Sequence, residues 1–337
     1  MRPFAYLRAH DPAEAVRAAS GPGGPPTSAP SQFLAGGTTL IDLMKLDVMR
    51  PSQVVDINDL SDELGEIHAD AAGLRLGALA RMADAAVHPA VLRDYPVIAQ
   101  SLELAASPQI RNMATLGGNV LQRTRCNYFR FTDFAECNKR VPGSGCAALH
   151  GVNRKLAVLG VSDRCIANYP GDFANVLAAL GAEVGIAGPS GARRMAFEAL
   201  HRLPGDSPDV ETTLRPGELI TGFFVPAGPW TRRSLYLKVR DRQSYEFALA
   251  AAAVALDLEG GVVRQARVGL GGVAAKPWRS REAEAVLTGR RLDEPAAAEA
   301  ARAAFAQAVS HGENAYKIEL GRRTLHRALL QAARMEV

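Results

Sequence analysis

The chain has 337 residues, about twice the length of a typical domain, which predicts two domains. Hydrophobic residues make up 47% of the chain and charged residues 22%, proportions that exclude global disorder, collagen and a coiled-coil rod. The 39 basic and 35 acidic residues leave a net charge of only +4, and no motif for reading nucleic acid is present. We therefore expect no nucleic-acid partner.

Neither a membrane span nor a secretory signal is expected. The longest purely apolar run, Phe247 to Leu256, is about half the length that a bilayer requires. Residues 1–20 carry charged side chains and no apolar stretch, so the chain is expected to have no targeting signal of its own. Export to the periplasm would then depend on a partner that carries a signal, and without such a partner we expect a cytoplasmic protein.

The first elements follow from capping residues and apolar spacing. Asp11 to Glu14 supply an N-cap, a proline at the first helical position and an acid in the first turn, so a helix should run to about Ala19. Gly21 to Gln32 are rich in glycine and proline and predict a surface loop. Strands are expected at 33–35, 54–57 and 74–76, and helices at 39–46, from about 81 to 106, and at 172–180 with Asp172 as the cap.

A stretch with prolines and glycine at about 225–232 predicts a domain boundary, which gives domains of 1–227 and 228–337. In the second domain, strands are expected at 235–239, 252–258 and 262–270, the last two joined by a hairpin turn. Helices are expected at about 280–287, 295–309 and 320–333. Strands and helices that follow one another in blocks favour an α+β fold.

Two loops with paired glycines are candidate sites for a diphosphate. They are Phe33 to Leu40 (FLAGGTTL) and Ala114 to Asn119 (ATLGGN). Glycine pairs allow successive backbone amides to turn toward an anion. The first loop is no P-loop, because no Gly-Lys-Ser or Gly-Lys-Thr follows it. Two such loops could enclose one diphosphate from two sides, although tight structural turns fit the pattern equally well.

All four cysteines fall within a 40-residue window: Cys126, Cys137, Cys146 and Cys165. The closely spaced cysteine pairs of structural zinc sites are absent, and four thiolates on a long irregular loop predict an iron–sulfur cluster. Nearby basic residues would offset the negative charge of a cluster and lower the pKa values of the thiols. These are Arg123, Arg125, Arg130, Lys139 and Arg140. Four unlinked buried cysteines, or a zinc-stabilised basic scaffold that binds nucleic acid, remain as alternatives.

Five segments resemble the FAD-binding subunits of the xanthine dehydrogenase family of molybdenum hydroxylases. They are FLAGGTTLIDLMKL, SPQIRNMATLGGNVLQRTRC, ECNKRVPGSGCAAL, LRPGELIT and VGLGGVAAKPWR. The resemblance is greatest to the aldehyde oxidoreductase branch, whose flavin subunit also carries a [4Fe–4S] cluster. It implies an α+β fold: a two-part FAD-binding domain of the vanillyl-alcohol-oxidase/CO-dehydrogenase flavoprotein type over 1–227, a cluster loop at 123–167 and a smaller C-terminal α+β domain over 228–337.

The resemblance also implies which residues contact the cofactors. The implied FAD contacts are Leu34, Ala35, Gly36, Gly37, Thr38, Thr39 and Leu40 in the first loop, Thr115, Gly118 and Asn119 in the second, and Gln122, Asp172, Ile220 and Lys238. The implied ligands of the [4Fe–4S] cluster are Cys126, Cys137, Cys146 and Cys165. By residue type alone, Asp172 would be only a helix cap and Lys238 a solvated strand lysine.

The implied function is that of an electron-transfer subunit with FAD and a [4Fe–4S] cluster. Its partners would be a [2Fe–2S] subunit and a large molybdopterin-binding subunit, where an aldehyde or an N-heteroaromatic substrate is hydroxylated. Electrons would reach FAD and leave to an external acceptor, and no catalytic residue is expected on this chain. A hydroxybenzoyl-CoA-reductase-type complex or an N-heteroaromatic hydroxylase is the alternative within the same family.

Overall fold

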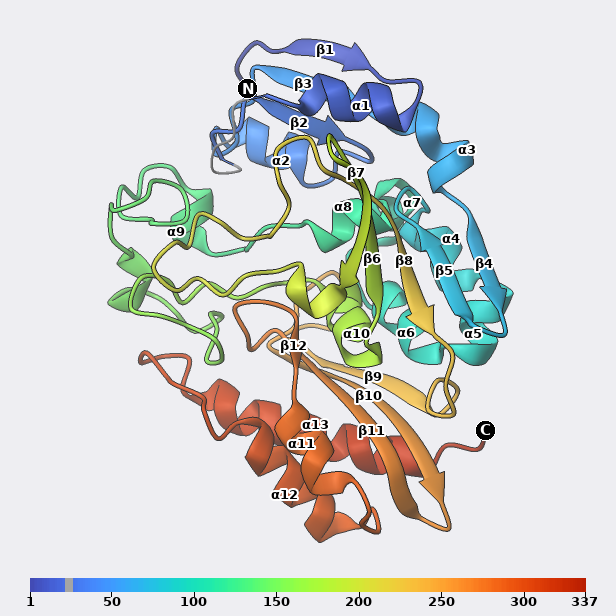
Figure 1. Ribbon diagram of the computed structural model, residues 1–337. Coiled ribbons are helices and arrows are strands. Elements are labelled where there is room, and N and C mark those ends of the chain that lie inside the picture. Colours follow the sequence, from blue (N-terminus) through green and yellow to red (C-terminus); the bar gives the residue numbers. More distant parts are fainter. Residues whose placement is uncertain (22–26) are drawn as a thin grey trace.

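The computed structural model describes residues 1–21 and 27–337 and contains three sheets with helices packed around them (Figure 1). The first sheet is parallel, in the order β1-β3-β2, with β1 at Ala5–Arg8, β2 at Ser31–Leu34 and β3 at Gln53–Asp56. The surface loop predicted at 21–32 ends early, because Ser31 and Gln32 pair with β3. Residues 22–26 of that prediction lie outside the described residues.

Short helices accompany this sheet. They are α1 (Pro12–Ala19), α2 (Leu40–Lys45), η1 (Asn58–Leu60) and α3 (Ser61–Leu64). Asp11 caps α1 as predicted: its side chain accepts the Glu14 amide at 2.7 Å. Helix α2 follows the first glycine loop directly, so the fold places that loop at the end of β2.

The second sheet is antiparallel, in the order β4-β5-β8-β6-β7. Its strands are β4 (Ile67–Asp70), β5 (Gly73–Gly77), β6 (Glu183–Gly188), β7 (Gly191–Ala196) and β8 (Leu219–Pro226). The helical elements between β5 and β8 in the chain are α4 (Met82–Val87), α5 (Pro89–Asp94), α6 (Pro96–Glu103), α7 (Pro108–Met113), α8 (Leu116–Val120), α9 (Asn127–Arg130), η2 (Ala147–Leu149), α10 (Asp172–Leu180) and η3 (Phe197–Ala199). The helical region predicted at 81–106 is divided, because Pro89 and Pro96 each begin a new helix.

The C-terminal sheet is antiparallel, in the order β12-β11-β10-β9, and its strands are β9 (Ser234–Val239), β10 (Ala250–Glu259), β11 (Val262–Gly271) and β12 (Trp278–Arg279). Helices α11 (Arg281–Leu287), α12 (Glu294–Ala304) and α13 (Tyr316–Ala333) pack against it. The predicted hairpin turn forms with Gly260 and Gly261 at φ values of 58° and 84°. The α+β prediction is confirmed.

Helix α10 joins the two halves of the molecule. All nine of its residues are buried, and it packs against α6, β8, β10 and β11. Strand β10 alternates between two cores: Ala251, Ala253 and Ala255 face the core that includes α10, whereas Ala252 and Val254 face the C-terminal helices. The core is therefore continuous across the boundary predicted near residue 227.

No helix within residues 1–21 and 27–337 is both long and apolar enough to cross a membrane.

Candidate functional site

The first glycine loop joins β2 to α2 and offers backbone donors. Gly37 has a φ of 72°, in the left-handed region that favours glycine. Among the described residues, the amides of Gly36, Gly37 and Thr38 find no hydrogen-bond acceptor. The other residues implied in this loop are half-buried around the same turn: Leu34, Ala35, Thr39 and Leu40. Unpaired amides in a glycine turn fit a diphosphate.

The second glycine loop runs from α7 into α8. Thr115 caps α8, and its Oγ1 accepts the Gly118 amide at 3.2 Å. Asn119 Nδ2 lies 3.3 Å from Met82 Sδ, whereas its buried Oδ1 has no hydrogen-bond partner in the part of the chain described. Gln122 donates to the Asn119 carbonyl at 2.9 Å. An orphaned amide oxygen fits a bound molecule that donates a hydrogen bond.

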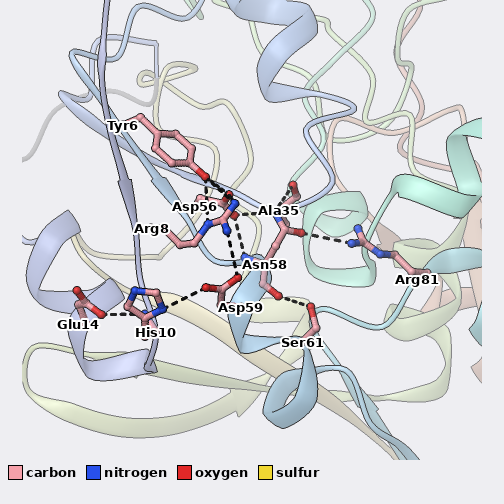
Figure 2. Close-up of polar contacts among 10 residues, drawn as sticks. All are labelled: Tyr6, Arg8, His10, Glu14, Ala35, Asp56, Asn58, Asp59, Ser61 and Arg81. Atoms are coloured by element: carbon pink, nitrogen blue, oxygen red, sulfur yellow. Dashed lines mark hydrogen bonds and ion pairs between the residues drawn. The ribbon is translucent and has the colours of Figure 1, made fainter.

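The two glycine loops lie against each other. A Cβ on Gly36 would be 1.9 Å from the Met113 carbonyl oxygen, so no side chain fits between the loops. Behind the first loop, Asn58 donates to the Ala35 carbonyl at 3.1 Å and accepts from Arg81 at 3.3 Å (Figure 2). Asn58 and Arg81 belong to no sequence motif, and the sequence reasoning missed both.

Asp172 and Lys238 form a buried ion pair between α10 and β9. The Asp172 Oδ2 to Lys238 Nζ distance is 2.7 Å, and the side chains are 4% and 1% exposed. Tyr236 donates its hydroxyl to Asp172 Oδ1 at 2.6 Å, and burial together with Asp172 raises the pKa of Tyr236 well above its usual value. Gly171 is the N-cap of α10 and no side chain caps the helix. The expected helix cap at Asp172 and solvated lysine at Lys238 are therefore wrong.

Ile220 lies in β8, where it is buried in the main core and pairs with Ile186 of β6. Helix α8 packs against both β8 and α10, so Ile220 and the Asp172–Lys238 pair lie in elements that support the second loop. Contact of these three residues with FAD stays a prediction.

The four cysteines converge on one small cavity. Cys126, Cys137 and Cys165 are buried, Cys146 is half-buried, and all four are free thiols that line the same space. They belong to a hydrophobic cluster that includes Leu43 of α2, the helix that follows the first glycine loop. Four converging thiols fit the ligand set of an iron–sulfur cluster.

The four cysteines are not arranged around one metal ion. No group of three or more His, Cys, Asp or Glu residues within 1–21 and 27–337 is arranged to hold one metal ion. Cysteine sulfurs that bind zinc all contact the same ion. In an iron–sulfur cluster, iron and sulfide atoms lie between the cysteine sulfurs. Burial raises the pKa of Cys126 to about 12 and that of Cys165 to about 11. Binding of a metal ion or of a cluster would therefore release protons from these thiols.

The basic residues of this segment do not bring the pKa values of Cys137 and Cys165 below the usual range, as was expected of them. Arg125 and Arg130 pair with Asp42 of α2 at 3.5 and 2.9 Å. Arg140 donates to backbone carbonyls, those of Tyr128, Phe129, Phe131 and Phe134. Burial raises the pKa values of Cys165 and Cys137, and it outweighs the lowering by Lys139 at Cys165 and by Arg140 at Cys137.

Glu211 binds the two remaining cations and was not predicted. Its carboxylate lies 2.5 Å from Arg123 Nε and 2.8 Å from Lys139 Nζ, and its side chain is 19% exposed. Burial alone would raise the pKa of Glu211, but the two cations lower it to about 2. Lys139 also donates to the Pro208 carbonyl at 3.0 Å. The stretch from 200 to 212 therefore packs onto the cysteine segment.

A cavity of about 50 Å³ lies between the residues that follow α8, the cysteine segment and the 200–212 stretch. Gln122, Cys165, His201 and Glu211 are among the residues that line it. His201 Nε2 lies 3.1 Å from the Val120 carbonyl oxygen, and its Nδ1 has no partner among the described residues. Burial lowers the pKa of His201 to about 4, so the ring is neutral at pH 7.

This fold, with two facing glycine loops, defines a flavin-binding subunit of an oxidoreductase. The FAD binding domain in molybdopterin dehydrogenase matches residues 2–228, and the CO dehydrogenase flavoprotein C-terminal domain matches residues 235–332. The chain belongs to the family of FAD-binding subunits of molybdenum hydroxylases. The resemblance seen in the sequence is confirmed.

Individual relatives cover almost the whole chain. The aldehyde oxidoreductase FAD-binding subunit PaoB of Escherichia coli is 44% identical over 333 residues, 98% of this chain and 99% of that protein. The carbon monoxide dehydrogenase medium chain of Afipia carboxidovorans is 29% identical over 89% of this chain and 88% of its own length. Among solved structures, the reconstituted CO dehydrogenase from Oligotropha carboxidovorans matches with a TM-score of 0.75 at 27% identity over 99% of both chains.

Proposed function

We propose that this chain binds a [4Fe–4S] cluster as well as FAD and serves as the electron-transfer subunit of a molybdenum hydroxylase that oxidises aldehydes. The observation that carries the proposal is the convergence of four thiols on one cavity beside α2, close behind the first glycine loop. The 44% identity to an aldehyde oxidoreductase subunit supports an aldehyde as the substrate class.

The rest of the complex would hold the substrate site. We infer a [2Fe–2S] subunit and a large molybdopterin-binding subunit as partners, with an external acceptor for the electrons. No residue of this chain is assigned a catalytic role. The compartment would be that of the partners, which is the periplasm if one of them carries an export signal.

Each cofactor has a set of residues suited to hold it. The unpaired amides of Gly36, Gly37 and Thr38 would hold the FAD diphosphate, and Asn119 Oδ1 would accept a hydrogen bond from the cofactor. The four cysteines would hold the cluster. When bound, these groups supply the one- and two-electron redox chemistry that the protein side chains lack.

The test is the absorption spectrum and iron content of the chain purified without oxygen. We expect flavin bands, a broad iron–sulfur shoulder and about four iron atoms per chain. Cys137→Ser replaces a soft thiolate with a hard hydroxyl and should lower iron and sulfide by about one cluster per chain. Asp163→Asn, an exposed change in the same segment, should keep both. A protein without iron, or unchanged iron in Cys137→Ser, would contradict the proposal.

A further inference from the structure

Asn58 occupies the space behind the first glycine loop, at the end of β3. Its Nδ2 donates to the Ala35 carbonyl at 3.1 Å and to Asp56 Oδ1 at 2.7 Å (Figure 2). The trans peptide that joins Ala35 to Gly36 directs its N–H opposite its carbonyl. The bond from Asn58 therefore fixes the unpaired Gly36 amide so that it points away from β3.

Arg81 makes the corresponding contact with the second loop. Its guanidinium donates to the Met113 carbonyl and to Asn58 Oδ1, and its backbone forms an isolated bridge with Thr115. The Asn58 carboxamide thus acts as a relay between the loops. Its nitrogen donates to the first loop, and its oxygen accepts from Arg81, which in turn contacts the second loop. Both loops depend on the same two side chains.

The charge of Arg81 is not neutralised locally. Within the part of the chain described, no carboxylate forms an ion pair with its guanidinium, and its acceptors are a neutral carbonyl and a neutral amide. Nearby Arg8, in contrast, pairs with Asp56 and Asp59 (Figure 2). An uncompensated cation beside a first loop with free amide donors favours an anion at that loop.

We propose that Asn58 and Arg81 are positioning residues for FAD, which hold the two glycine loops at a fixed separation while Arg81 supplies positive charge to the diphosphate. The inference rests on the FAD site of this family and is independent of the cluster. Loops joined before the ligand arrives lose less conformational freedom on binding, so the affinity for FAD should depend on this pair.

The test measures the FAD affinity of the flavin-free chain by fluorescence titration. Asn58→Ala and Arg81→Gln should each raise the Kd for FAD about tenfold, the effect of losing one or two good hydrogen bonds. The double variant should be little weaker than either single variant, because the two side chains form one relay. Independent contributions would multiply to about a hundredfold and would overturn the relay.

The salt dependence of FAD binding separates the effect of the positive charge of Arg81 from the effect of its hydrogen bonds to the loops. Arg81→Gln should flatten the loss of FAD affinity with rising salt, whereas Asn58→Ala and Arg81→Lys should keep the wild-type slope. Arg8→Gln, at the outer end of the same network, is the matched control and should leave the Kd unchanged. Should Asn58→Ala fail to fold, Arg81→Lys still tests the relay, because this variant keeps the positive charge and removes the guanidinium that contacts both Asn58 and Met113. Wild type without FAD affinity would refute the FAD site itself; wild-type affinity in all variants would refute only this inference.

Discussion

Glu211 is an ionised carboxylate that stays charged in a largely buried place because Arg123 and Lys139 face it at 2.5 and 2.8 Å. Both cations come from the cysteine segment, and their side chains are only 5% and 10% exposed. The carboxylate therefore joins the 200–212 stretch to the segment that we propose to hold the cluster.

Glu211→Gln should lower the free energy of unfolding by about 3 kcal/mol, because it leaves two buried cations without their counter-charge. Denaturation by urea at pH 7 measures the effect. Glu259→Gln, which breaks an exposed pair with Arg264, should change the same quantity by less than about 1 kcal/mol. The folded pKa of Glu211 is depressed, so its contribution is present above pH 4.5 and is lost as the pH falls toward 2. An equal loss of unfolding free energy in Glu211→Gln and Glu259→Gln would show that the buried ion pairs of Glu211 contribute no more than an exposed pair.

The sequence indicated candidate site residues only where residue type restricts the possibilities. Paired glycines and clustered cysteines are such cases, since few other residues replace them. Asp172 suited both a helix cap and an ion pair, and its partner Lys238 lies 66 residues away. Asn58, Arg81 and Glu211 have no local signal at all, because the groups that give them a role come from distant parts of the chain.

Helix α13 contains a lysine that is fully buried. Lys317 donates to the Lys155 carbonyl at 3.0 Å and to the Gly272 carbonyl, so it joins the helix to the cysteine segment (residues 123–167) and to the turn after β11. Burial, with smaller contributions from Arg154 and Lys155, lowers the pKa of Lys317 to about 7.

Lys317→Met should remove a pH dependence of stability in the alkaline range. Between pH 7 and 10.5 the unfolded lysine binds more protons than the folded one, so wild-type stability should rise with pH by up to about 1.4 kcal/mol per unit. Urea denaturation at several pH values measures this slope, which the variant should flatten. Arg323→Gln, an exposed change on the same helix, should keep it. A slope unaffected by Lys317→Met would show that the lysine is not charged differently in the two states.

At the scale of elements, amphipathic patterns were the reliable signal. The C-terminal strands and helices were predicted to within a few residues, except the two-residue β12, the first turn of α13 and the end of α12, which stops at Ala304 and not near residue 309. Strands β1, β4, β6, β7 and β8 were missed. Strands β4 and β7 are edge strands with many exposed residues, and β6 begins and ends near glycines, so none shows a clear apolar alternation.

At the scale of the whole molecule, the chain should be unable to use a substrate by itself. The isolated protein should fail to reduce its FAD with aromatic aldehydes in the absence of oxygen, whereas dithionite should reduce it. Addition of the [2Fe–2S] and molybdopterin-binding partners should restore bleaching of the flavin by aldehyde, followed at its absorption bands. Bleaching by aldehyde without partners would make this chain a self-contained dehydrogenase and would refute the subunit role.

The alternation of β10 between two cores has a consequence for biosynthesis. A nascent chain that has left the ribosome only as far as β8 contains nearly all of the first family domain, yet it lacks the strand that covers α10. The buried face of α10 then stays exposed until about residue 255 emerges, which makes this interval the natural point for chaperone binding. The Asp172–Lys238 pair likewise forms only after β9 is synthesised, so this buried ion pair depends on the C-terminal domain.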